Sequence, residues 1–196
     1  MIAYLKGNIA QLDPAFVVID CRGVGYMAKI SLYTYDHLQG KKEVLLHTFL
    51  LVREDAHTLY GFANTREKSM FEQLITVSGV GANTALVMLS SMEVEELFHA
   101  IRTEDVLQLK RIKGIGAKSA ARIVLELKDK LKLEGTVAEA GRKGGPSSGL
   151  KQEALAALIS LGLPKATMEK RLDDLVKAHG SDISVEQLVK LALRNP

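Results

Sequence analysis

The sequence has 196 residues, of which 47% are apolar and 25% are charged, and its formal net charge is +3. This composition supports a buried core and excludes a disordered chain, while so mild a net charge does not by itself mark a nucleic-acid binder. The single cysteine, Cys21, excludes an intrachain disulfide and a cysteine-rich metal site. No signal peptide or membrane span is recognisable, so we expect an unprocessed, soluble protein of the reducing cytoplasm.

The first 63 residues consist of short apolar runs separated by turn-forming residues. The runs FVVIDC, YMAKISL, EVLLHTFLLV and HTLYGF are rich in β-branched and aromatic side chains, and Gly, Pro, Asp or Asn stands between them. Such runs are typical of strands in a small all-β unit. We therefore predict a compact barrel over residues 1–63, with Gly23 and Gly25 where a strand bends or another backbone comes close.

From residue 64 onward the apolar residues recur with the period of a helix. Met70 and Leu74 begin this pattern, which continues to residue 127 and predicts five short helices in an all-α domain over residues 64–133. Thr103 is followed by two acidic residues, which is typical of a helix start with a hydroxyl cap.

Two similar glycine turns interrupt the helices, VSGVGANTA at residues 77–85 and IKGIGAKSA at residues 112–120. A single glycine after a helix is commonly only a C-cap. Here each turn holds two glycines separated by one aliphatic residue, and each opens a new helix whose first amides lack internal partners and attract anions. The duplication therefore favours phosphate binding, with Val80 and Ile115 anchoring the turns.

The charges are distributed unevenly along the helical segment. Residues 83–105 hold one Arg against five acids, whereas residues 106–132 hold eight Lys or Arg against two acids. Lys113, Lys118 and Arg122 flank the second glycine turn within this basic stretch. The sequence therefore predicts one strongly cationic local surface beside that turn.

Residues 134–149, EGTVAEAGRKGGPSSG, contain five glycines, a proline and two serines, and predict a flexible linker. Beyond it, residues 150–196 contain three amphipathic segments with turns at Leu163-Pro164 and Gly180. This length is small but suffices for a three-helix bundle.

The paired GVG and GIG turns, the preceding run VREDAHTLYGF and the loose linker before a helical tail together resemble the RuvA family of bacterial Holliday-junction recognition proteins. The resemblance covers the whole chain in order. It implies an α+β multidomain fold with an N-terminal OB-fold barrel, a central helix-hairpin-helix domain and a UBA-like C-terminal three-helix bundle. It also implies a homotetramer on four-way junction DNA, alone or as two tetramers face to face, with the RuvB ATPase motor and the RuvC resolvase as partners in DNA recombination and repair.

The resemblance further implies that the two hairpins hold phosphates of a duplex arm in the minor groove, which positions DNA without reading its sequence. Many relatives carry Lys shortly after each hairpin, whereas this chain has Asn83 after the first and Ala117 before Lys118 in the second. The predicted DNA-binding residues are Gly79, Val80, Gly81, Asn83, Lys113, Gly114, Ile115, Gly116, Lys118, Ser119 and Arg122.

Two further sets of residues take their expected roles from the resemblance. Glu54 and Asp55 lie between two strand-like runs, where acids are ordinarily no more than a solvated turn. In the RuvA family such a pair forms an acidic pin that meets its copies at the fourfold centre and repels the crossing strands. In the tail, an apolar stripe is mainly core, and from it we expect Leu158 and Leu161 to contact the motor.

Other classes of function fit the sequence less well. GIGAKS is not a Walker loop because Ala117 separates Gly116 from Lys118, and no strand precedes it as a dinucleotide fingerprint requires. A helix-hairpin-helix nuclease or glycosylase needs a positioned Asp or Lys in a pocket, and the sequence indicates no such constellation. A single-strand binder needs exposed aromatic side chains, which five Phe, five Tyr and no Trp supply poorly. We therefore expect a non-catalytic subunit of an ATP-dependent branch-migration complex, without a cofactor or metal of its own.

Overall fold

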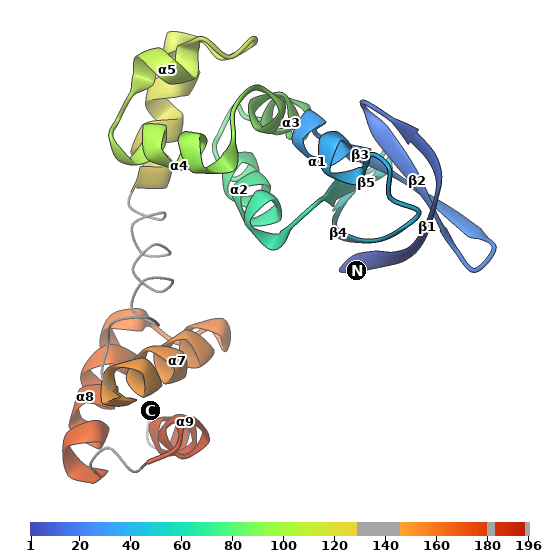
Figure 1. Cartoon of the computed structure of the whole chain (residues 1–196). Coiled ribbons are helices and arrows are strands. Elements are labelled where there is room, and N and C mark those ends of the chain that lie inside the picture. The colour runs from blue at the N-terminus through green and yellow to red at the C-terminus, as the bar shows by residue number, and fades with distance from the viewer. Residues whose placement is uncertain (129–145, 180–182, 195–196) are drawn as a thin grey trace. The chain divides into compact units, whose positions relative to one another are not determined.

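The computed structural model describes residues 1–128, 146–179 and 183–194 (Figure 1). The chain divides into two compact units, Met1–Leu131 and Lys132–Pro196. The first unit contains the β-sheet and the two glycine turns, and the second contains the C-terminal helices.

The N-terminal part of the first unit is a closed five-stranded barrel with the strand order β1-β2-β3-β5-β4. Neighbouring strands are antiparallel, except that β3 and β5 pair in parallel. The barrel elements are β1 (Tyr4–Asp13), β2 (Phe16–Cys21), β3 (Val24–Ile30), α1 (Leu32–Leu38), β4 (Glu43–Val52) and β5 (His57–Phe62). The predicted OB-fold barrel is confirmed.

The helix α1 differs from the sequence prediction, because the run YMAKISL has the pattern of one strand. In the structure β3 ends at Ile30, and Ser31 caps α1 by accepting a hydrogen bond from the amide of Thr34 at 3.0 Å. A serine before a polar and aromatic segment is a helix-start pattern that the apolar run conceals. The helix fills the connection between β3 and β4.

The helical part of the first unit contains five helices in the described residues, as the apolar period predicts. They are α2 (Thr65–Ile75), α3 (Ala82–Ser91), α4 (Val94–Arg102), α5 (Val106–Lys110) and a helix over residues 117–128. The expected helix start at Thr103 is wrong: Thr103 is the C-cap of α4, and its hydroxyl donates to the carbonyl of His99 at 2.9 Å. Asp105 caps α5 instead, because its carboxylate accepts from the amide of Gln108 at 2.9 Å.

Aromatic side chains pack the barrel against the helices. Phe71 of α2 is fully buried, and its ring centroid lies 4.9 Å from that of Phe62, 5.0 Å from that of Tyr60 and 5.7 Å from that of Phe49. The other three rings belong to β4 and β5. Because tilted and edge-on aromatic pairs add to the stabilisation from buried area, this cluster is a strong apolar contact between the two domains.

The second unit contains α7 (Pro146–Ser160), α8 (Lys165–His179) and α9 (Val185–Arg194). Its core is formed by Ala154, Leu158, Met168, Leu172, Ile183, Leu188 and Ala192. The predicted linker over residues 134–149 requires a correction at its end, since α7 already begins at Pro146, where proline suits a first helical turn. The remainder of the predicted linker and the turn at Gly180 lie outside the described residues.

Candidate nucleic-acid interface

The first hairpin joins α2 to α3 through a turn centred on Gly79. Gly79 has φ +88°, in the left-handed region that favours glycine. Val80 is 5% exposed, and its amide donates to the carbonyl of Val77 at 3.0 Å. Gly81 then serves as the N-cap of α3 in an extended conformation. The turn is therefore anchored on its inner side and presents its two glycines to solvent.

The second hairpin repeats this geometry 35 residues later. Gly114 also has φ +88°, Ile115 is 5% exposed, and the amide of Ile115 donates to the carbonyl of Ile112 at 3.1 Å. In both hairpins the first intrahelical hydrogen bond measures 2.9 Å, from Ala85 to Gly81 and from Ala120 to Gly116. The sequence repeat is thus a repeat of backbone conformation.

The buried aliphatic residues change the set of DNA contacts expected from the sequence. Val80 and Ile115 have buried side chains, and their amides are already bonded within the turns. We therefore assign Val80 and Ile115 an anchoring role and remove them from the set of phosphate contacts. The exposed surface at each turn includes the residue before the first glycine, the glycine backbone and the first residues of the helix that follows.

The helix starts are open toward solvent. Gly81 has no side chain to cap α3, and a Cβ placed at Gly79, Gly81, Gly114 or Gly116 would meet no atom of the described residues within 4 Å. The uncapped amides of a first helical turn attract anions through their partial positive charge. Because none of the residues that the structure describes fills the space above the glycines, a sugar-phosphate backbone can approach these amides closely.

The second residue of each new helix is exposed, and its identity differs between the hairpins. It is Asn83 in α3 and Lys118 in the helix over residues 117–128. Ser119, the next residue, is half-buried, and Lys113 in the second turn is exposed. The second hairpin therefore carries two lysines at its surface, and the first carries a neutral amide at the corresponding place.

Arg122 connects the two hairpins. Its Nη1 donates to the carbonyl oxygen of Ser78 at 3.3 Å, and its Nε lies 3.7 Å from a carboxylate oxygen of Glu126. Ser78 directly precedes Gly79, so a cation from the second motif reaches the turn of the first. The two turns and Arg122 thus form one surface, which we call the hairpin surface.

The acidic pair lies at the tip of the β4–β5 hairpin. Val52 pairs with His57 at the end of the ladder, and the amide of Arg53 donates to the carbonyl of Ala56 at 2.9 Å. Glu54 and Asp55 occupy the apex between them, and both are exposed. We call this apex the acidic tip.

The two expected motor-binding leucines have opposite environments. Leu158 is 0% exposed in the core of the second unit, whereas Leu161 is 63% exposed after α7. Leu158 packs inside its own bundle and has no surface to offer a partner, so its expected role is corrected. Leu161, with Ile159 at 41% and Leu193 at 46%, remains available for a contact.

Sequence reasoning missed a buried polar cluster at the start of α2. Glu67 is 0% exposed, and the hydroxyls of Ser31 and Thr34 donate to its carboxylate. Burial raises the pKa of Glu67, and the hydrogen bonds from Ser31 and Thr34 oppose that shift in part. The pattern Asn64 to Glu67 is a capping-box spacing, so the local signal was present although the long-range partners were not recognisable.

Among the described residues, no group of three or more His, Cys, Asp or Glu side chains is placed to hold a metal ion. The described helices also include none with the length and apolar character needed to span a membrane.

Comparison with known proteins agrees with this arrangement of domains. Residues 1–61 match the RuvA N-terminal domain, residues 71–129 match the SAM-like helix-hairpin-helix tandem, and residues 150–195 match the RuvA C-terminal domain. A Cytophaga hutchinsonii protein named Holliday junction branch migration complex subunit RuvA is 47% identical over 197 residues, covering 99% of each chain. This chain belongs to the RuvA family.

Other RuvA proteins are similar over their full length. The subunit from Bacteroides thetaiotaomicron is 46% identical over 99% of each chain, and that from Flavobacterium psychrophilum is 44% identical over 100% of each. Membership of the RuvA family confirms the resemblance inferred from the glycine turns and the VREDAHTLYGF run. The OB-fold, helix-hairpin-helix and C-terminal domains of the RuvA fold all have counterparts in the structure.

Proposed function

We propose that this chain is the DNA-binding subunit of a branch-migration complex and that its hairpin surface grips the arms of a four-way junction. The observation that carries the proposal is the duplicated hairpin, in which exposed glycines and uncapped helix amides stand over open space. Backbone amides bind phosphate without reading bases, as recognition of junction shape requires. The proposed contacts are Gly79, Gly81, Asn83, Lys113, Gly114, Gly116, Lys118, Ser119 and Arg122.

The acidic tip has a different part in this proposal. Glu54 and Asp55 are exposed at the end of a hairpin that begins in the barrel core. In a homotetramer, one copy from each subunit meets at the junction centre, where carboxylates repel the crossing strands and hold the junction open and planar. The hairpin surface attracts the arms while the acidic tip separates them.

The proposed assembly follows the number of arms in the junction. One subunit engages each arm, so four copies form a tetramer, and a second tetramer can face the first across the junction. The second unit recruits and positions the RuvB ATPase motor through the exposed apolar residues around Leu161. The RuvC resolvase is a further proposed partner, and the chain itself carries out no ATP hydrolysis or strand cleavage.

A binding assay with three DNA substrates tests this function. We expect the purified chain to retard a synthetic four-way junction far better than a linear duplex or a single strand of equal length, without cleavage and without ATPase activity. If about four to eight phosphates are neutralised per tetramer, the slope of log affinity against log salt is roughly −4 to −7. Cleavage products would favour a nuclease, and preference for single strands would favour a barrel-based binder.

A variant at Gly81 tests the hairpin contact itself. Gly81 has φ −83°, which any residue can adopt, and a Cβ there would touch none of the described atoms within 4 Å, so Gly81→Ser fits the fold. A serine N-cap also satisfies one amide of α3 and is preferred over alanine or valine at this place. We expect equal or higher thermal stability together with weaker junction binding, because the hydroxyl and Cβ occupy the phosphate's position. Unchanged binding would contradict phosphate contact at this turn.

A further inference from the structure

The carboxylate of Glu67 accepts its hydrogen bonds where the barrel meets the helices. Glu67 belongs to the first turn of α2, and its Oε1 accepts from the hydroxyl of Ser31. Its Oε2 accepts from the hydroxyl of Thr34 at 2.6 Å and from the amide of Ala63 at 3.0 Å. Ser31 and Thr34 lie at the start of α1, 36 and 33 residues away in the chain.

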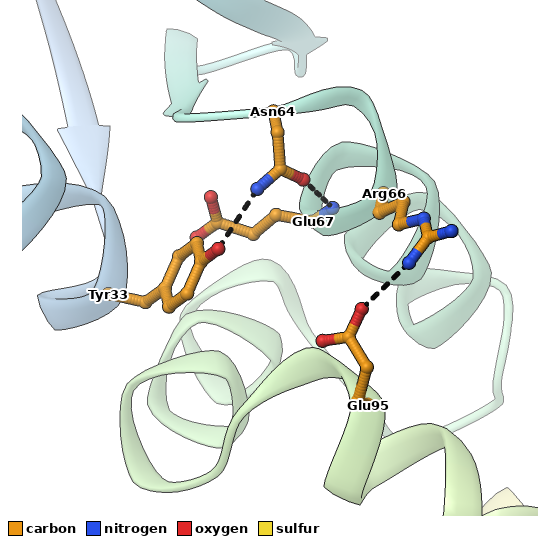
Figure 2. Close-up of polar contacts among 5 residues, drawn as sticks. All are labelled: Tyr33, Asn64, Arg66, Glu67 and Glu95. Carbon is orange, nitrogen blue, oxygen red and sulfur yellow. Dashed lines mark hydrogen bonds and ion pairs between the residues drawn. The ribbon is translucent and has the colours of Figure 1, made fainter.

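A second set of bonds joins the same two helices. Figure 2 shows Asn64 between them: its Oδ1 accepts from the amide of Glu67 at 2.9 Å, and its Nδ2 donates to the hydroxyl of Tyr33 at 3.1 Å. The amide of Ala63 also donates to Thr34 Oγ1 at 2.9 Å. We call Ser31, Thr34, Ala63, Asn64 and Glu67 the interdomain ring.

The interdomain ring lies between the barrel, which carries the acidic tip, and the helices, which carry the hairpin surface. On one side, β5 ends at Phe62, next to Ala63, and begins beside the acidic tip. On the other side, α1 reaches α3, since the amide of Leu32 donates to Ser90 Oγ at 3.0 Å, and α3 starts at the first hairpin. The helices α1 and α3 lie side by side in Figure 1. The ring therefore connects the barrel that carries the acidic tip to the helices that carry the hairpin surface.

Adhesion alone does not explain a buried carboxylate at this place. The aromatic cluster around Phe71 already holds β4 and β5 against α2. Burying an ionisable group is unfavourable, and replacing such a group with apolar side chains is often neutral or stabilising. Directional hydrogen bonds, however, are satisfied in only one relative orientation of the elements they join, whereas apolar surfaces tolerate sliding.

We propose that Glu67 and Thr34 are positioning residues, which fix the orientation of the acidic tip relative to the hairpin surface and thereby determine selectivity for a four-way junction. This inference rests on the proposed function. The acidic tip and the hairpin surface contact different parts of the same four-way junction, the tip at its centre and the hairpins on its arms. Both contacts therefore require one orientation of the tip relative to the hairpins. A linear duplex engages the hairpins alone, and these are held to each other by the bond from Arg122 to Ser78 inside the helical domain.

Two substitutions at Thr34 separate the hydrogen bonds from the packing. Thr34→Val keeps the shape of a fully buried side chain but removes the hydroxyl that donates to Glu67 and accepts from Ala63, whereas Thr34→Ser keeps that hydroxyl. The matched control is Arg66→Ala. Arg66 also lies at the start of α2, but its 3.0 Å ion pair joins the exposed Glu95 of α4, within the helical domain (Figure 2).

The readout is the ratio of junction affinity to linear-duplex affinity, measured with the full chain at a temperature where circular dichroism shows it folded. We expect Thr34→Val to lower this ratio about fivefold to tenfold, in the usual range of coupling between sites, with duplex affinity within about twofold of the parent protein. Thr34→Ser and Arg66→Ala are expected to keep the parent ratio. A role in stability alone would leave the ratio unchanged while the protein is folded.

The outcomes distinguish this inference from the function on which it rests. If the parent protein does not prefer the junction, the proposed function fails. If the parent prefers it and a folded Thr34→Val keeps the full ratio, the positioning role is overturned and the function stands. Should Thr34→Val fail to fold, Glu67→Gln tests the positioning role in the same assay. This variant keeps the side-chain volume, but its single amide oxygen cannot accept hydrogen bonds from both hydroxyls and the Ala63 amide.

Discussion

The guanidinium of Arg122 donates a hydrogen bond of 3.3 Å to the carbonyl oxygen of Ser78. Arg122 belongs to the helix that follows the second hairpin, and Ser78 directly precedes Gly79 in the first. The bond therefore brings positive charge to a turn whose own helix offers only Asn83. The second hairpin thus places a guanidinium, which is also paired with Glu126, beside the turn of the first.

Removal of this charge tests whether the Arg122 guanidinium contributes to phosphate binding. We expect Arg122→Ala to weaken junction binding at least about tenfold, since a charge-assisted interaction disappears from every subunit that engages an arm. The salt slope is expected to become shallower by about 0.9 for each phosphate that the variant no longer neutralises. Gel-shift titrations at several salt concentrations measure both quantities.

Lys128 provides the control for the Arg122 experiment. It lies on the same helix, six residues or about 9 Å further along, and forms an ion pair with Glu104. Lys128→Ala removes the same charge, yet we expect affinity and salt slope close to those of the parent protein. Equal losses of affinity in the two variants would show that only net charge matters and would contradict a specific role for Arg122.

The conformation of Gly79 makes a prediction about stability. Its φ of +88° is unfavourable for a residue with a Cβ even though the space around it is open. We expect Gly79→Ala to lower the free energy of unfolding by about 1–2 kcal/mol, the usual penalty for a left-handed residue. Urea unfolding followed by tyrosine fluorescence reports the unfolding of the first unit alone, because all five tyrosines lie before residue 61. A variant as stable as the parent protein would show that the turn relaxes to another conformation.

The sequence predicted the parts of this site that depend on local periodicity. Strand runs, helical periods and the repeated glycines follow from neighbouring residues, and the structure has them where expected. The sequence did not predict α1, because β3 ends at Ile30 and Ser31 then caps a helix inside one apolar run. Nor did it predict that Leu158 faces inward while Leu161 faces outward, since a stripe of leucines does not reveal which of its members the other helices cover.

Interactions between distant segments were beyond local patterns. Glu67 lies 36 residues from Ser31, and Arg122 lies 44 residues from Ser78. Each residue has an ordinary local explanation, the first as a capping-box acid and the second as one cation in a basic helix. Only the folded chain brings each residue to its partner. The sequence therefore indicated the hairpins, but neither the bond between them nor the bond between α2 and α1.

The acidic tip makes a prediction of opposite sign to that of the hairpin surface. Glu54→Gln combined with Asp55→Asn removes repulsion, which at 4 Å is about 1 kcal/mol per charge pair in water and about 4 kcal/mol at an effective dielectric constant of 20. We therefore expect junction affinity equal to or higher than that of the parent protein in a gel-shift titration. Markedly weaker binding by the double variant would mean that the carboxylates contribute to the grip, contrary to the proposed separation of roles.

The raised pKa of Glu67 predicts how stability varies with pH. Burial is the main cause, and the folded value lies above the ordinary value of 4.5. Such a group contributes stability that is complete below the unfolded pKa and is lost as the pH rises through the folded pKa. The free energy of unfolding of the parent protein, relative to that of Glu67→Gln, is therefore expected to fall as the pH is raised from 4.5 toward neutrality.

Tyrosine-monitored urea unfolding at a series of pH values measures this difference. Glu95→Gln is the control, because that side chain is 65% exposed in its ion pair with Arg66. A difference between the parent protein and Glu67→Gln that grows in the parent's favour with rising pH would contradict the assigned direction of the pKa shift.

The contrast between Leu158 and Leu161 separates folding of the second unit from docking of a motor. Leu158 is fully buried, so Leu158→Ala is expected to destabilise the bundle by about 2–5 kcal/mol, enough to unfold so small a unit. Leu161 is 63% exposed, so Leu161→Ser is expected to leave thermal unfolding unchanged and to weaken association with the ATPase motor. Junction binding without the motor is expected to survive both changes, because the hairpin surface lies in the other unit. Circular dichroism and a pull-down with the motor distinguish the two effects, and full motor binding by Leu161→Ser would exclude this leucine from the docking surface.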